Sequence, residues 1–267
     1  MKNQTVTKLN SDCYPIEERK LLSEHNEMFR RWKETLQHSD DVNIRNGAQW
    51  MTNDGFYPFY TSQKMKILYL GRDSYGMLGC DYLDTFYNVY RSVKKIGEKG
   101  KEKSLNQHQF HARLLHVTWG ILNGMTEWDM IPWAETIGDN FGTQNGISFA
   151  FANLGKTRFQ EEGTNADLKS IEAFCKASTK DHNFIAEQIS LLKPDVIISM
   201  NLGKWLDWIG PRKLLEESSN AESYILEVPD HQCLLVNTWH FSARKEQKTK
   251  IYKPICDALM KWNIERP

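Results

Sequence analysis

Four short apolar runs constrain the fold of this 267-residue chain more than any other feature. They are MKILYLG (65–71), ISFAFAN (147–153), DVIISMN (195–201) and CLLVNTW (233–239). Each run is almost continuously apolar instead of alternating with polar residues, which is typical of a strand covered on both faces. Because helix-like stretches lie between these runs, the sequence predicts an α/β fold with three α/β/α layers around a central four-stranded parallel sheet.

The spacing of apolar residues also predicts where the helices lie. Residues 15–37 place leucine, methionine and aromatic side chains on one face, so an N-terminal extension of residues 1–60 is expected to be helical. Further helical stripes fall at 185–192, 202–209 and 252–262. Residues 76–145, rich in aromatic residues and histidine, are interpreted as helices and a long loop inserted between the first and second strands. We expect one domain over residues 1–267, since no linker or repeat is visible.

The composition is that of a globular protein, and it excludes a disordered or fibrous one. The chain has 40% hydrophobic and 25% charged residues, typical of a globular protein. Its 34 basic and 34 acidic residues cancel, so any site for a polyanion must be a local patch. Residues 91–103 and 242–253 are two such basic segments, although charge runs are more often plain solvated surface.

The first ten residues lack the apolar stretch of a secretory signal, and no apolar run approaches the roughly 20 residues of a membrane span. Five scattered cysteines without a CxxC pair argue against a zinc ribbon, an iron–sulfur cluster and a disulfide framework. We therefore expect a cytoplasmic protein that uses neither a metal nor a cofactor and contacts no membrane.

Each apolar run ends in a polar group. These groups are Asp73, Asn153, Asn201 and His240. In an open parallel sheet, ligands bind beyond the carboxyl ends of the strands, where these residues would meet. Taken singly, each has a structural alternative: Asp73 and Asn201 as helix caps, Asn153 as a partner of loop backbone, and His240 as a hydrogen-bonded structural histidine. The cap is the preferred interpretation for Asn201, whereas an acid, an amide and an imidazole on three strand ends indicate a catalytic site.

Three of these strand ends carry motifs that, in this order, resemble those of the uracil-DNA glycosylase superfamily. GRDSY (71–75) matches the first motif at the glycine, the acid and the tyrosine, but has Ser74 where the family version closest to this chain has proline. FAFANLGKTR (149–158) is similar to a strand ending in asparagine and followed by Lys-x-Arg. His240-Phe241-Ser242 stands where the family has His-Pro-Ser. The resemblance covers about residues 56–73, 147–158 and 190–262.

The resemblance implies a role for each matched residue. His240 would donate a hydrogen bond to the base carbonyl and stabilise the anion of the departing base. Asp73 would orient the attacking water and stabilise the cationic sugar. Asn153 would read the pyrimidine edge, which excludes cytosine because cytosine presents the opposite pattern of donors and acceptors. Tyr75 would crowd the carbon that bears the methyl group of thymine.

Other residues are expected to hold the extruded nucleotide. Phe86 is the first candidate to stack on the base, with Tyr82 and Tyr87 as rivals and a core role as the alternative. Arg244 follows His240 by four residues, at the place where the family positions the residue that plugs the duplex. Ser242 and Lys245 complete the expected DNA contacts.

The sequence thus predicts a monomeric, monofunctional DNA glycosylase that removes uracil or a related damaged pyrimidine from single- or double-stranded DNA, as in base excision repair. The missing prolines and the inserted residues 76–145 indicate a divergent branch. Two alternatives stay open. One is an inactive module of the same fold that binds modified or single-stranded DNA, and the other is an unrelated small-molecule hydrolase, for which no GxSxG, Walker or dinucleotide motif is present.

Overall fold

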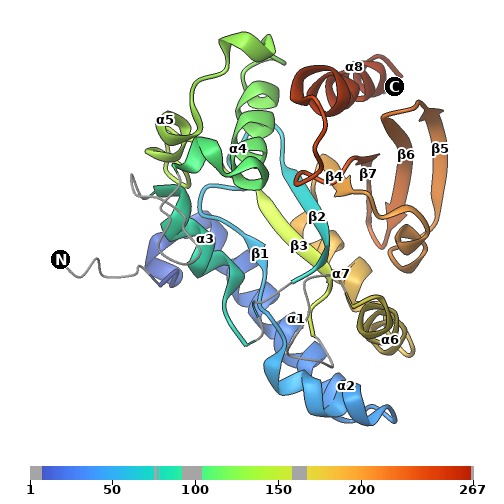
Figure 1. The fold of residues 1–267 in the computed structure, drawn as a ribbon. Helices are drawn as coiled ribbons and strands as arrows, with labels where there is room; N and C mark the ends of the chain where they lie inside the picture. Colours follow the sequence, from blue (N-terminus) through green and yellow to red (C-terminus); the bar gives the residue numbers. More distant parts are fainter. Residues whose placement is uncertain (1–7, 75–76, 78, 92–103, 158–166, 266–267) are drawn as a thin grey trace.

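A mixed sheet of seven strands forms the centre of the structure (Figure 1). The computed structural model describes residues 8–74, 77, 79–91, 104–157 and 167–265. Within them the strand order is β1-β3-β2-β4-β7-β6-β5. The strands are β1 (Gly55–Phe56), β2 (Ile67–Asp73), β3 (Ala150–Gly155), β4 (Val196–Met200), β5 (Arg212–Glu217), β6 (Ala221–Val228) and β7 (His231–Thr238).

The four apolar runs of the sequence are β2, β3, β4 and β7. Strand β2 pairs in parallel with β3 and β4, and β4 pairs in parallel with β7. Antiparallel partners extend both sides: β1 pairs with β3, β6 with β7, and β5 with β6. The sheet is therefore mixed and has seven strands, whereas a sheet of four parallel strands was expected. The β5–β6 hairpin was not predicted from apolar runs, because β5 is an edge strand with mostly exposed side chains.

Helices precede, connect and follow these strands. The α-helices are α1 (Arg19–Gln37), α2 (Val42–Gly47), α3 (Tyr82–Arg91), α4 (Gln109–Leu122), α5 (Ala134–Gly138), α6 (Leu168–Ser178), α7 (Phe184–Leu192) and α8 (Lys253–Glu265). The helix expected at 15–37 begins as a 3-10 turn and continues as α1. Residues 1–60 are not wholly helical, because they include β1, and the stripe at 202–209 forms a 3-10 helix. In the described part of the chain no helix is long and apolar enough to cross a membrane.

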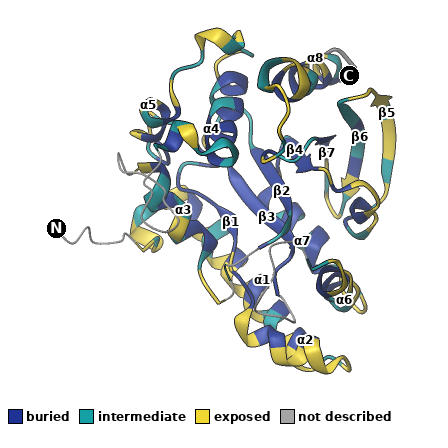
Figure 2. Cartoon of the chain, viewed as in Figure 1, coloured by how far each residue is buried: buried dark blue, intermediate teal, exposed yellow. Residues whose placement is uncertain are grey.

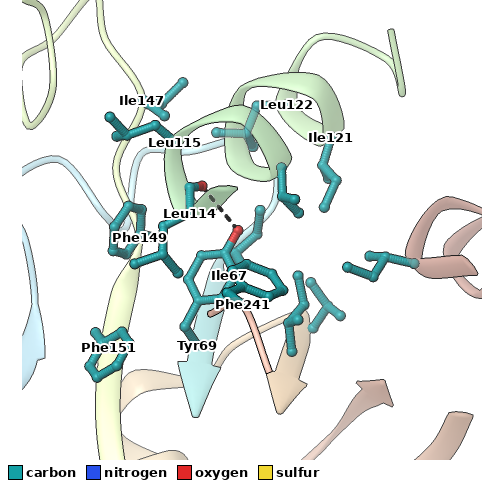
Figure 3. Close-up of a cluster of buried hydrophobic side chains, with 14 of the residues drawn as sticks. Ile67, Tyr69, Leu114, Leu115, Ile121, Leu122, Ile147, Phe149, Phe151 and Phe241 are labelled. Atoms are coloured by element: carbon teal, nitrogen blue, oxygen red, sulfur yellow. Dashed lines mark hydrogen bonds between the residues drawn. The ribbon is translucent and has the colours of Figure 1, made fainter. Parts of the chain in front are cut away.

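Both faces of the sheet are covered by helices, as the buried strands required (Figure 2). Alternate residues of β2 separate the two apolar clusters: Tyr69 belongs to one, Leu68 and Leu70 to the other. The Tyr69 cluster includes α3, α4, α5 and α8, and in it Phe241 lies beside Tyr69 (Figure 3). The opposite cluster includes α1, α2, α6 and α7. Helices α3, α4 and α5 come from residues 76–145, so this segment supplies one wall of the core.

The parallel strands bring their carboxyl ends to one edge of the sheet. Gly71 pairs with Asn153, and Asp73 pairs with Gly155. The chain runs from β2 to β3 on one side and then crosses over to β4 on the other, so the connections change direction between β2 and β4. Such a switch point leaves a crevice in which α/β proteins bind ligands.

Candidate active site

A cavity of about 600 Å³ lies at this edge of the sheet. Its walls include the ends of β2, β3 and β4, the residues after β7, and parts of α3 and α4. Five of the residues predicted from the sequence line it, and these are Asp73, Phe86, Asn153, His240 and Ser242. Three segments far apart in the chain thus bring a carboxylate, an amide and an imidazole into one cavity.

The side chain of Asn153 fits against the backbone of the neighbouring strand. A Cβ atom at Gly71 would lie 2.4 Å from Oδ1 of Asn153 and 3.3 Å from Cζ of Phe151. Glycine at position 71 therefore leaves the space in which the amide lies. Nδ2 of Asn153 is buried and has no hydrogen-bond partner among the described residues. Burying an amide without a partner costs free energy, so this group is suited to donate to a ligand.

A buried ion pair supports the strand end that carries Asn153. Nζ of Lys156 lies 2.7 and 2.6 Å from the two carboxylate oxygens of Asp54, and both side chains are fully buried. Lys156 also donates to the carbonyl of Asn153 over 2.8 Å, and Asp54 accepts from the N–H of Asn153 over 2.8 Å. Gln188 donates to Asp54 over 2.9 Å. Both the backbone N–H and the carbonyl of Asn153 are thus held by the buried ion pair.

The hydrogen bonding of His240 defines which ring nitrogen can donate. The backbone N–H of Ser242 donates to Nδ1 of His240 over 3.1 Å. Since an N–H can only donate, Nδ1 is the acceptor and the proton of the neutral ring is on Nε2. Burial lowers the pKa of His240, and the nearby charges of Arg72 and Arg113 lower it further. The imidazole is therefore neutral at pH 7, with Nε2–H as its donor.

Aromatic rings form the apolar wall of the cavity. Phe86 lies with its ring centroid 4.4 Å from Tyr82 and 4.4 Å from His111, so it takes part in packing as well as in lining the cavity. The ring of Phe110 stacks on His240 at 5.7 Å. Phe110 and His111 belong to no motif, so they could not be selected from the sequence; the position of α4 beside the cavity identifies them.

Two of the expected DNA contacts, Arg244 and Lys245, do not line the cavity. Arg244 is exposed, and Nζ of Lys245 lies 3.9 Å from the ring centroid of Trp239. In the basic segment 242–253, Lys248 pairs with Asp129, and Lys253 pairs with Asp257. Two basic side chains of this segment are thus already matched by acids.

Two other predictions have separate outcomes. Asn201 lines the cavity in a left-handed conformation with φ 57°, and its carbonyl accepts from Arg72 over 2.6 Å. The expected cap is wrong, because the 3-10 helix that follows begins at Gly203, with Leu202 as its N-cap, and no side chain caps it. Tyr75 and most of the basic segment 91–103 lie outside the described residues.

Comparison with known proteins adds no relative to this picture. A scan against protein-family models and a search of curated proteins each found no match to the chain. The residues of the cavity are therefore the basis on which a function is proposed.

Proposed function

We propose that the chain is a glycosylase of the uracil-DNA glycosylase type, which hydrolyses the N-glycosidic bond of uracil or a related damaged pyrimidine in DNA. One observation carries the proposal: a neutral imidazole, His240, whose Nδ1 is occupied by a backbone N–H and whose Nε2–H remains as donor, lines the same cavity as Asp73 and Asn153. The parallel strands with the three motifs at their carboxyl ends support a fold of this type.

In this proposal the chemistry depends on opposite charges developing on the two halves of the substrate. The bond between the sugar carbon and the ring nitrogen breaks, and its electron pair leaves with the base. Nε2–H of His240 donates to the base carbonyl, and the nearby positive charge of Arg72 further favours the anion. Asp73 stabilises the cationic sugar and orients water, whose oxygen bonds to the sugar carbon while its proton passes to the carboxylate and then to solvent. The base takes up a proton after release.

Recognition of the base is assigned to Asn153 in an apolar surround. Its buried Nδ2 would donate to the exocyclic oxygen, and Oδ1 would accept from the ring N–H. Cytosine has a donor where uracil has the exocyclic oxygen and an acceptor where uracil has the ring N–H, so it would leave the amide of Asn153 unpaired. Such a mismatch lowers activity on cytosine relative to uracil by several orders of magnitude. Phe86 and Phe110 provide rings against which an extruded base can stack.

The test is cleavage of single- and double-stranded oligonucleotides that contain one uracil, followed by alkali treatment of the abasic product. We expect Asp73→Asn and His240→Ala each to lower the rate by about 10²–10³-fold. His182→Ala is the matched control, because His182 is exposed and pairs with Glu187 outside the cavity. A gel shift without cleavage by the wild type would favour the inactive binding module, and the absence of any interaction with DNA would favour a small-molecule hydrolase.

A further inference from the structure

Arg113 is a fully buried cation in the middle of α4, only 1% exposed. Burial lowers its pKa to about 10, so the guanidinium still carries its charge at pH 7. A buried charge is costly unless it is hydrogen-bonded. The hydrogen-bond partners of Arg113 therefore identify the segment of the chain that α4 positions.

These partners are three backbone carbonyls of the loop that follows His240. Nη1 donates to the carbonyl of Phe241 over 2.6 Å and to that of Ala243 over 2.8 Å, and Nη2 donates to that of Lys245 over 2.8 Å. Gln109, one turn earlier on α4, donates from Nε2 to the carbonyl of Ala243 over 2.6 Å. The planar guanidinium holds its N–H donors in a fixed fork. It therefore fixes the positions of three alternate carbonyls of the loop, those of Phe241, Ala243 and Lys245.

The same loop contains the N–H that sets the state of His240. The N–H of Ser242 donates to Nδ1 of His240, and the N–H of Ala243 donates to the carbonyl of His240 over 2.7 Å. Both donors lie between the carbonyls that Arg113 holds. The side chain of Phe241 is fully buried beside Tyr69 and anchors the start of the loop (Figure 3).

We propose that Arg113 is a positioning residue, whose fork on α4 holds loop 241–245 so that the N–H of Ser242 occupies Nδ1 of His240 and leaves Nε2–H directed to the substrate. The catalytic part of this inference rests on the proposed function. Arg113 performs from a distant helix the task that a proline after the histidine would perform locally.

The charge of Arg113 has a second, separable effect, because it is one of the two cations that lower the pKa of His240. Among the described residues, the other charged or titratable side chains that line the cavity with His240 come from β2, from α3, and from α4 or its start. They are Arg72, Asp73, Tyr82, His108 and His111. An Arg113→Lys variant keeps the charge but loses the fork, whereas Arg113→Met loses both.

The experiment reads His240 directly, without a substrate. Two-dimensional NMR of ¹⁵N-histidine-labelled protein reports the tautomer and the pKa of each ring, and a His240→Gln variant identifies the signals of His240. In Arg113→Met we expect the neutral ring of His240 to populate both tautomers and its pKa to be raised. In Arg113→Lys we expect both tautomers of His240, with a pKa near that of the wild type. Arg91→Met is the matched control, since Arg91 donates to the carbonyl of Phe141 outside the cavity, and it should leave His240 unchanged.

Turnover of uracil-containing DNA provides the second readout. We expect kcat of Arg113→Met to fall about tenfold to a hundredfold with KM within about twofold, as for a misplaced catalytic group. An unchanged tautomer and pKa of His240 in folded Arg113→Met would overturn the inference. If Arg113→Met does not fold, Arg113→Lys and Gln109→Ala decide instead, and wild-type His240 tautomers in both would overturn it. A wild type inactive on DNA would defeat the proposed function, while the NMR signals would still decide the role of Arg113.

Discussion

The buried ion pair behind Asn153 offers the sharpest test of how the site is held. Lys156 and Asp54 are both fully buried and joined by two short hydrogen bonds. Nζ of Lys156 also lies 5.4 and 5.3 Å from the ring centroids of Phe29 and Trp32. We predict that Asp54→Asn strongly destabilises the fold, because it leaves an ammonium group in this apolar surround without its carboxylate.

The size of the effect follows from the kind of pair that is broken. Removing one member of a buried ion pair costs about 3–5 kcal/mol, because the remaining charge is uncompensated. Burial already lowers the pKa of Lys156, and Asp54 opposes that shift, so the pKa falls further in Asp54→Asn. Above that lower pKa the unfolded chain binds a proton that the folded chain has lost. The free energy of unfolding of the variant should therefore rise with pH by up to about 1.4 kcal/mol per pH unit. In the same pH range the free energy of unfolding of the wild type should not yet change with pH.

Urea denaturation followed by tryptophan fluorescence at pH 7 and pH 9 measures both quantities. Asp40→Asn is the matched control, because Asp40 pairs with Lys180 on the exposed surface, and it should match the wild type. The double variant Asp54→Asn/Lys156→Met should recover much of the loss, since no buried charge remains. Equal stability of Asp54→Asn and Asp40→Asn at pH 7 would refute the reasoning.

Two further predictions concern the cavity and the response to acid. Gly71→Ala should slow cleavage of uracil-containing DNA about tenfold or more, because its Cβ would displace the amide of Asn153, and a variant as active as the wild type in single-turnover assays would contradict this. Burial first, and then the charge of Lys156, lower the pKa of His25 to about 3. Below pH 6.5 only the unfolded chain protonates this histidine, so stability should fall by about 1.4 kcal/mol per pH unit, and urea denaturation from pH 7 to 5 should show a smaller slope in His25→Gln.

The central strands could be predicted because burial on both faces leaves a continuous apolar run. Strands β2, β3, β4 and β7 all have this property. Strands β5 and β6 do not, because β5 exposes most of its side chains at the sheet edge and the turn between them, at residues 218–220, has no glycine. Strand β1 has only two residues, too few for any pattern. Pattern reasoning therefore detects the middle of a sheet and misses its margins.

The grouping of Asp73, Asn153 and His240 could also be anticipated, since each follows a predicted strand and parallel strands end at one edge. The residues that support them could not. Asp54, in a loop, and Arg113, in a helix, have charged side chains that local sequence assigns to the surface. Their burial depends on partners that only the tertiary fold brings close, and Arg113 lies 128 residues from Phe241.

The same contrast applies to Phe241, which stands where the resembled motif has proline. A proline restricts the backbone conformation of its loop through its own covalent ring. This restriction can be inferred from the sequence, and it is present even before the chain folds. Here the loop is fixed by a buried phenylalanine ring and by the fork of Arg113, both of which act only after α4 has packed on the sheet. On our proposal, the segment inserted between β2 and β3 and the altered motif after β7 are therefore one adaptation, in which the geometry of His240 is determined by the docking of a distant helix.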